Sequence, residues 1–182
     1  MKIFETLEEI RNIEPAAVAL GNFDGVHLGH QELIRQMVNT ARERGLKAAV
    51  FTFSNHPKDL LPKEKKVKNI LNKKEKAQII ESLGVDYLFN IEFTKAIMTM
   101  EPITFINTLL LEKFNMKAAF CGFNYHFGYK AQGTPDVLRN VGMEKGFDVT
   151  EMSAYKIKGN IVSSSMISVL IIEELTMLPL IL

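Results

Sequence analysis

The sequence predicts a Rossmann-like, doubly wound parallel α/β domain. Short apolar runs alternate along its 182 residues with segments whose apolar side chains repeat at helical spacing. The apolar runs are nearly continuous, which is typical of strands buried on both faces of a parallel sheet. The first run leads directly into a glycine-rich turn and a helix, and this junction is where such sheets bind phosphate groups.

The expected elements follow one another in a regular order. Residues 1–15 form a polar entry with one helical turn at 6–10. About five strands are expected, at 16–20, 47–53, 86–93, 117–121 and 148–157. Helices are expected at 28–44, 72–83, 102–114 and 135–145, with Asn72 and Thr134 as N-caps and Gly45, Gly84 and Gly146 as C-terminal stops. No repeat and no Ser/Gly-rich linker divides this pattern, so it predicts one domain.

The glycine-rich turn at residues 21–30 reads Gly-Asn-Phe-Asp-Gly-Val-His-Leu-Gly-His. Glycines let the backbone approach a ligand, and the start of a helix offers free N–H groups and a partial positive charge. His27 and His30 are three residues apart on the first helical turn, so both imidazoles can face one spot. Two hydrogen-bond donors aimed at one phosphate suit phosphoryl or nucleotidyl transfer.

Three other interpretations of this turn compete. A His-x-x-His pair could bind a metal, but zinc takes three or four ligands, and His56, His126 and Cys121 are scattered along the chain. A dinucleotide site would require Gly-x-Gly-x-x-Gly, which the turn lacks. The glycines could also form an ordinary surface turn with exposed histidines.

Composition restricts the partners. The formal net charge of +1 gives no field that favours nucleic acid, and a small anionic metabolite fits the charge equally well. The start of the chain lacks the apolar region of a signal peptide, and no apolar run reaches the roughly 20 residues that span a bilayer. We therefore expect a cytoplasmic protein without nucleic-acid or membrane partners, and the oligomeric state stays open. Cys121 lies in an apolar run, which favours a buried structural thiol.

Three further segments could serve a ligand. The run from Lys58 to Lys76 carries eight lysines, and we interpret it as a solvated loop in preference to a phosphate-recruiting one. The aromatic, glycine-spaced segment 122–133 follows a predicted strand, where it could present backbone and a carboxamide to a nucleotide or a flat ring. Ser163, Ser164 and Ser165 open a helical pattern and could cap it or donate to phosphate.

These segments together resemble bacterial FAD synthetases, the FMN adenylyltransferase module usually found at the front of a bifunctional riboflavin kinase/FAD synthetase. The His-x-Gly-His core at 27–30 marks only the wider nucleotidyltransferase superfamily, and the preceding residues 22–26 make the match more specific. His56-Pro57 resembles the family's Thr-Phe-x-x-His-Pro element, and 122–133 resembles its second motif. The three serines fall on the first positions of its Ser-Ser-Thr-x-[Ile/Val]-Arg motif.

The resemblance implies transfer of AMP from ATP to FMN, giving FAD and pyrophosphate, with Mg²⁺ accompanying ATP and no metal ligand assigned to the protein. It implies catalytic roles for His27 and His30. It places ATP and phosphate contacts at Gly21, Asn22, Phe23, Asp24, Gly29, Ser163, Ser164 and Ser165. It places flavin contacts at His56, Pro57, Asn124, Tyr125, Phe127 and Gly128.

The sequence departs from the family pattern near its end. The motif arginine falls on Ser168, so a cation expected at the triphosphate is missing. We expect an adenylyltransferase domain over 1–174 and an apolar tail over 175–182, with weakened activity and a tendency to associate. The riboflavin kinase domain does not follow in this sequence, so we expect no phosphorylation of riboflavin.

Two other functions remain open at this stage. Another nucleotidyltransferase of the superfamily, acting on a different small phosphate, would share the two histidines but would not need the aromatic loop or His56-Pro57. A nucleotide- or flavin-binding protein with impaired catalysis is the second alternative, and the serine at 168 is its best support.

Overall fold

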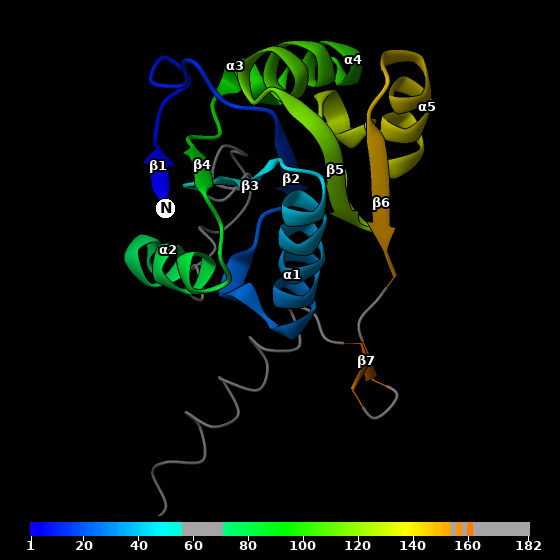
Figure 1. Ribbon diagram of the computed structural model, residues 1–182. Coiled ribbons are helices and arrows are strands. Elements are labelled where there is room, and N and C mark those ends of the chain that lie inside the picture. The colour runs from blue at the N-terminus through cyan, green and yellow to red at the C-terminus, as the bar shows by residue number, and fades with distance from the viewer. Residues whose placement is uncertain (56–70, 154–155, 158–159, 162–182) are drawn as a thin grey trace, which may run out of the picture.

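A six-stranded, fully parallel sheet forms the centre of the fold (Figure 1). The structure is a computed structural model that describes residues 1–55, 71–153, 156–157 and 160–161. The strand order is β1-β4-β3-β2-β5-β6. The strands are β1 (Lys2–Phe4), β2 (Ala16–Leu20), β3 (Lys47–Phe53), β4 (Tyr87–Ile91), β5 (Met116–Gly122) and β6 (Asp148–Met152). The short strands β7 (Lys156–Ile157) and β8 (Asn160–Ile161) pair with each other outside this sheet.

The predicted fold class is confirmed, but three details of the sequence prediction differ from the structure. The sheet has six strands, because the polar entry contributes β1, which pairs with β4 at the edge of the sheet. β1 has only three residues, and one of them is buried, so the strand is too short to show a hydrophobic pattern in the sequence. The expected helical turn at 6–10 is a hydrogen-bonded turn without a helix, and the expected strand 148–157 ends at Met152.

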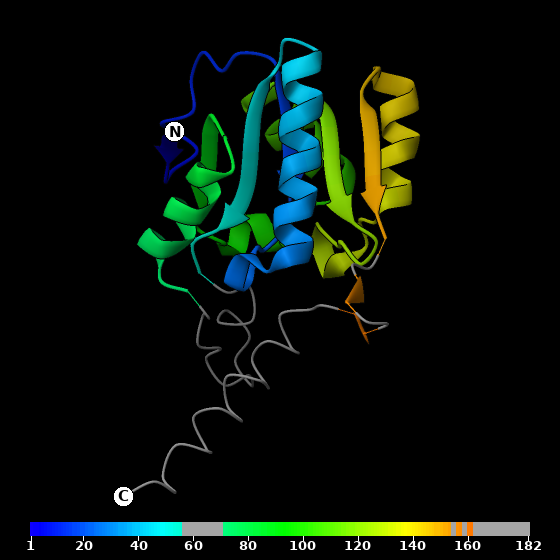
Figure 2. The same cartoon turned by 60° about the horizontal axis from the view of Figure 1, so that its bottom comes forward.

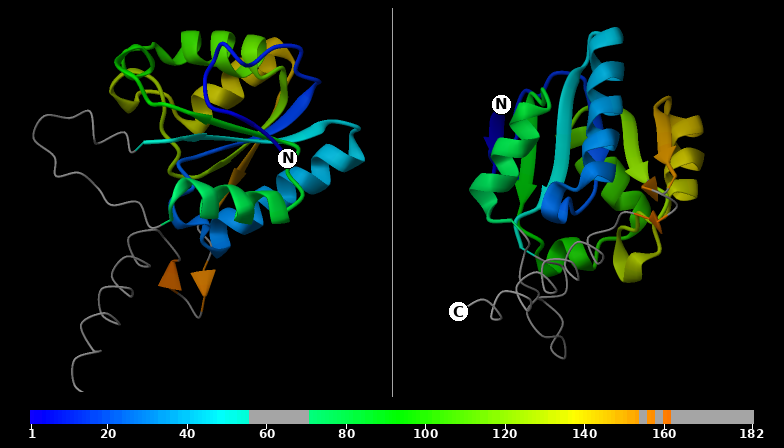
Figure 3. Two further views of the ribbon diagram at one scale, coloured as in Figure 1. Left: turned by 90° about the vertical axis from the view of Figure 1, so that its left-hand side faces the viewer. Right: turned by 90° about the horizontal axis from the view of Figure 1, so that it is seen from below.

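Helices cover both faces of the sheet, as Figure 3 shows with the sheet seen on edge. One face packs against α1 (Leu28–Glu43) and α2 (Lys73–Ser82). The other face packs against the segment formed by α4 (Pro102–Thr104) and the π-helical η3 (Phe105–Lys113), and against α5 (Pro135–Lys145). The short helix α3 (Lys95–Met98) precedes α4. Because both faces are covered, β2 is buried along its whole length.

The helix ends follow the predicted caps. Asn72 forms a capping box with Glu75 at the start of α2, and the Thr134 side chain accepts the Val137 N–H at the start of α5. Gly146 ends α5 in the left-handed conformation with φ of 77°. Across the described ranges, no helix combines the length and the hydrophobicity needed to cross a bilayer.

β2 lies at the point where the order in which strands are added to the sheet reverses. Its neighbours are β3 on one side and β5 on the other, and the connections from these strands lead to opposite faces. In Figure 2 the arrowheads of β3, β5 and β6 end at one lower edge, where α1 begins. Ligands bind at the carboxyl ends of the strands beside such a switch point. The fold therefore directs attention to the segments that follow β2, β3 and β5.

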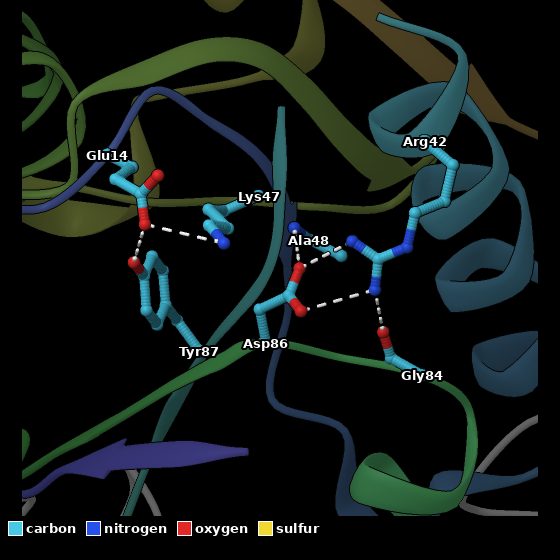
Figure 4. A network of polar contacts seen from close by, with 7 residues as sticks. All are labelled: Glu14, Arg42, Lys47, Ala48, Gly84, Asp86 and Tyr87. Atoms are coloured by element: carbon cyan, nitrogen blue, oxygen red, sulfur yellow. Dashed lines mark hydrogen bonds and ion pairs between the residues drawn. The ribbon is translucent and has the colours of Figure 1, made fainter. Parts of the chain in front are cut away.

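The opposite edge of the sheet is held by the polar network in Figure 4. The Asp86 carboxylate accepts two hydrogen bonds from the Arg42 guanidinium, at 2.6 and 3.2 Å, and one from the Ala48 N–H at 2.8 Å. Arg42 also donates to the Gly84 carbonyl at 2.8 Å. Burial alone would raise the pKa of Asp86, but Arg42 and the Ala48 N–H together lower it. The network ties the end of α1 to the starts of β3 and β4.

We predict that Asp86→Ala lowers the free energy of unfolding by roughly 1 to 3 kcal/mol, because Arg42 and the Ala48 N–H lose a charged acceptor. Since folding lowers the Asp86 pKa, its contribution is present above the ordinary Asp pKa of about 4 and is lost as the pH falls through the lowered value. Urea unfolding at pH 7 and pH 3 measures both effects. Asp148→Ala, which removes an exposed partner of Arg44, is the control and should change little. Equal effects of the two variants at pH 7 would contradict the network's role.

Candidate active site

The turn that follows β2 is strained and anchored in the core. Phe23, Gly25 and Val26 have positive φ values of 47°, 71° and 37°. This region is unfavourable for bulky and β-branched residues, so the surroundings must hold the turn in place. The side chains of Phe23 and Val26 are each 1% exposed and belong to the core between the sheet and α1. The Phe23 ring is thus a structural anchor, and only its backbone can face a phosphate.

The two signature histidines lie against each other at the start of α1. His27 is the N-cap of the helix, and its Nδ1 accepts the His30 backbone N–H at 3.3 Å. The two imidazole rings stack with centroids 3.6 Å apart, and the edge-on Phe23 ring lies 5.1 Å from the His30 ring. The prediction that both imidazoles share one spot at the beginning of the helix is therefore confirmed.

Both imidazoles are neutral near pH 7. Burial lowers the pKa of His27, although Asp24 opposes this effect. Burial, followed by the charges of His27 and Lys76, lowers the pKa of His30 to about 3. Since Nδ1 of His27 accepts a hydrogen bond, the proton of the neutral ring lies on Nε2. His27 can thus donate a hydrogen bond without carrying a charge.

A polar network formed by Thr52 and Lys76 holds the turn through the Asn22 carbonyl. The Thr52 hydroxyl donates to the Asn22 carbonyl oxygen at 2.7 Å, and Thr52 itself is 0% exposed. The Lys76 ammonium donates to the same carbonyl at 2.8 Å and to Thr52 Oγ1 at 2.7 Å. Burial lowers the pKa of Lys76 to about 8, with Asp24 acting in the opposite direction. Lys76 is therefore largely protonated at neutral pH.

A small polar cleft opens beside this network, at the carboxyl ends of β3 and β4. Asn22, Asp24, Ser54, Asn55, Asn90 and Lys76 are among the residues that line it. Asn55 both donates to and accepts from the Phe93 backbone, at 3.1 and 2.7 Å, which fixes the exit from β3. Asn90 is 7% exposed, and its Oδ1 has no hydrogen-bond partner among the described residues.

The second loop begins next to the first. Leu20 pairs with Cys121, so Gly21 and Gly122 leave the sheet from neighbouring positions. Asn124 is exposed in this loop and available to a ligand. Burial raises the pKa of the Cys121 thiol to about 12, which agrees with a structural thiol.

The aromatic rings of this loop face inward to different degrees. The Phe127 ring is 6% exposed and packs on Phe105 and Tyr125, with centroid distances of 5.2 and 5.6 Å. The Phe127 ring therefore belongs to the core and supports the loop, and its flavin contact stays a prediction. Tyr125 is partly buried against the same core, and burial raises its pKa. Flavin contacts from Tyr125 stay a prediction.

Gly128 has a structural reason for being glycine. Its φ is 72°, and a Cβ there would lie 3.0 Å from Pro102. The neighbouring Tyr129 N–H donates to the Met100 carbonyl at 2.7 Å, so the loop is fastened to the segment before α4. The flavin contact of Gly128 stays a prediction.

Several predicted site residues lie outside the described residues. They are His56, Pro57, Ser163, Ser164, Ser165, Ser168 and the tail 175–182. The described candidates Gly21, Asn22, Phe23, Asp24, Gly29, His27 and His30 come together at the start of α1.

Sequence reasoning missed Lys76, Thr52 and Asn90. Lys76 was interpreted as part of a solvated lysine run, but it lies on α2 and its ammonium is partly buried. Thr52 and Asn90 are paired neighbours on β3 and β4. Each is a single polar residue near the carboxyl end of an apolar strand, and this pattern could have identified them from the sequence. Within the described part of the chain, no three His, Cys, Asp or Glu side chains gather as a metal site.

Comparison with known proteins agrees with this geometry. Residues 9–166 match the family model described as FAD synthetase. The chain belongs to the FAD synthetase family. Its relatives include proteins called bifunctional riboflavin kinase/FMN adenylyltransferase from Escherichia coli K12, 30% identical over 152 residues, and Bacillus subtilis, 37% identical over 120 residues. These alignments cover 84% and 65% of this chain, and 49% and 38% of the relatives.

This chain is also similar to a solved structure. A crystal structure described as a macrolide-efflux protein from Streptococcus pneumoniae is 28% identical, with a TM-score of 0.81. It covers 91% of this chain and 53% of the other. A Buchnera aphidicola relative, 29% identical over 166 residues, also has 53% of its length covered. The chain spans about half the length of the curated relatives it matches.

We predict that the imidazole signals of His27 and His30 report neutral rings at pH 7, with the midpoint of His30 near 3. Because folding lowers both pKa values below about 6.5, the unfolded chain binds more protons, and stability falls as the pH decreases from 6.5. NMR titration from pH 8 to the acid limit of folding measures this, with His30→Ala used to assign signals. A His30 midpoint near 6.5 would contradict the buried neutral pair.

Proposed function

We propose that the chain transfers AMP from ATP to FMN, releasing FAD and pyrophosphate. The observation that carries the proposal is the stacked pair of imidazoles at the N-terminus of α1, beside the carboxyl end of the central strand β2. Family membership and the FMN adenylyltransferase name of the relatives support the choice of substrates.

The reaction needs positioning and charge stabilisation from the protein. An oxygen of the FMN phosphate attacks the α-phosphorus of ATP, a new P–O bond forms, and the bond from the α-phosphorus to the bridging oxygen of pyrophosphate breaks. Negative charge grows on the leaving group as this bond lengthens. The N–H groups at the start of α1 and Nε2–H of His27 are donors that can stabilise that charge without giving up a proton.

Neutral histidines suit this role. A pair of charged imidazoles in a stack with centroids 3.6 Å apart would repel each other, so the arrangement favours two uncharged donors. Mg²⁺ would enter with ATP, because magnesium is commonly held by substrate phosphates, water and one or two carboxylates. Asp24, in the turn itself, is the carboxylate that fits this donor set.

We expect the full chain, incubated with ATP, FMN and Mg²⁺, to form FAD and pyrophosphate in equal amounts, measured by chromatography and a coupled phosphate assay. His30→Ala should lower kcat by about 10² to 10³, with a much smaller loss of ATP affinity, because a donor aimed at developing charge is lost. Gln36→Ala, an exposed position on the same helix, is the matched control. Near-normal turnover by His30→Ala would contradict the catalytic role of His30. If the unaltered chain formed no FAD, the proposed reaction would be wrong.

We also expect Asn124→Ala to raise the KM for FMN by roughly 3- to 10-fold, the value of one or two lost hydrogen bonds, with kcat changed less. The reason is its exposed carboxamide on the loop that begins beside the phosphate-binding turn. Initial-rate kinetics at saturating ATP measure the change, with Gln36→Ala again as the control. An increase in the KM for ATP alone would assign Asn124 to the nucleotide.

A further inference from the structure

Lys76 occupies an unusual position for a lysine. It lies on the first turns of α2, whose start is fixed by the Asn72–Glu75 capping box. Its ammonium reaches three acceptors at the carboxyl edge of the sheet: the Asn22 carbonyl at 2.8 Å, Thr52 Oγ1 at 2.7 Å and, more weakly, the Phe53 carbonyl at 3.4 Å. One side chain thus links α2, the end of β3 and the signature turn.

This arrangement is costly for stability. Taking an ammonium group out of water is unfavourable, and an apolar side chain of similar volume is often as stable or more stable at such a position. A partly buried cation that a fold retains against this cost is a candidate for a functional role. Among the described residues, Asp24 of the turn, His30 of α1 and Lys73 of α2 are charged or titratable groups that face or line its surroundings.

The contact to the Asn22 carbonyl determines how the turn presents its backbone. The structure contains no cis peptide bond among the described residues, and in a trans peptide the N–H points opposite to the preceding C=O. Holding the Asn22 oxygen toward Lys76 therefore directs the Phe23 N–H away from it. The same anchor restrains Phe23 at its unfavourable φ of 47°.

Lys76 also supplies a positive charge beside the turn, which the neutral histidines do not. Both imidazoles are neutral at pH 7, whereas the Lys76 charge is close enough to His30 to lower the pKa of that imidazole. The ammonium therefore places a fixed positive charge beneath the turn that receives phosphate.

We propose that Lys76 is a positioning residue: by holding the Asn22 carbonyl together with Thr52, it orients the phosphate-binding turn and places a partly buried positive charge next to it. The inference rests on the proposed adenylyl transfer for its kinetic consequence. Its structural consequence, the coupling of Lys76 to the turn, can be tested without that reaction.

The test compares Lys76→Met, Thr52→Val and the exposed control Lys74→Met in the full chain. Lys76→Met should lower kcat/KM for ATP by roughly 10- to 100-fold, because small misplacement of a phosphate-binding group has effects of this size. The KM for FMN should stay within about 3-fold, since this lysine is assigned to the turn. The thermal midpoint should be unchanged or higher, because a buried charge has been removed. Lys74→Met should match the unaltered chain in every respect.

Three results would overturn the assignment. The first is unaltered kinetics in Lys76→Met. The second is a raised KM for FMN at constant kcat, which would make Lys76 a direct ligand of the acceptor. The third is a loss of activity matched by a loss of stability, which would reduce Lys76 to a structural residue. If Lys76→Met does not fold, Thr52→Val carries the test, with an expected loss in kcat/KM of roughly 3- to 10-fold from one hydrogen bond.

A spectroscopic measurement separates this inference from the proposed reaction. In the unaltered chain, the amide signals of Asn22, Phe23 and Asp24 should shift with a common midpoint near pH 8 as Lys76 loses its proton. The shift should disappear in Lys76→Met and persist in Lys74→Met. If no FAD forms but this titration is seen, the proposed reaction fails and the positioning role stands. If FAD forms but the turn does not respond to Lys76, the positioning role fails alone.

Discussion

The placement of β2 between β3 and β5 in a fully parallel sheet is the constraint on which the site depends. Because all six strands run the same way, the segments after β2, β3 and β5 must leave at one edge. Because β2 is covered on both faces, its register is fixed and the turn at Gly21 cannot slide along the sheet. The start of α1, the cleft beside Thr52 and the loop at Gly122 therefore meet without any of them needing to be long or adaptable.

Charge in this site is distributed in a way that sequence alone does not suggest. The residues that look like the charged partners of phosphate, His27 and His30, are neutral because burial lowers the pKa of both, and the charges of His27 and Lys76 further lower the pKa of His30. The positive contribution comes from the N-terminus of α1 and from Lys76, whose ammonium is held by backbone and hydroxyl oxygens. This division suits a transfer reaction in which donors must stabilise growing charge and no side chain needs to donate its proton fully.

The fold, and the meeting of the signature residues at the start of α1, could be predicted from the sequence because both depend on local patterns. Continuous apolar runs such as 16–20 are readable because both faces of the strand are buried, and caps such as Asn72 and Thr134 act locally. The edge strand β1 was missed because three residues carry no periodic signal. Lys76 was misassigned because its burial depends on α2 packing beside the turn, which brings together residues 54 positions apart in the chain. The burial of the Phe127 ring likewise depends on Phe105, a contact that no local pattern encodes.

The first turn of α1 is the proposed binding site for the phosphates of ATP. The most direct measurement is a crystal structure of the chain with a non-hydrolysable ATP analogue and Mg²⁺. We expect the phosphates to lie at the N-terminus of α1, with Nε2 of His27 within about 3 Å of a phosphate oxygen, the distance of an ordinary hydrogen bond. A nucleotide whose phosphates lie away from both histidines would contradict it.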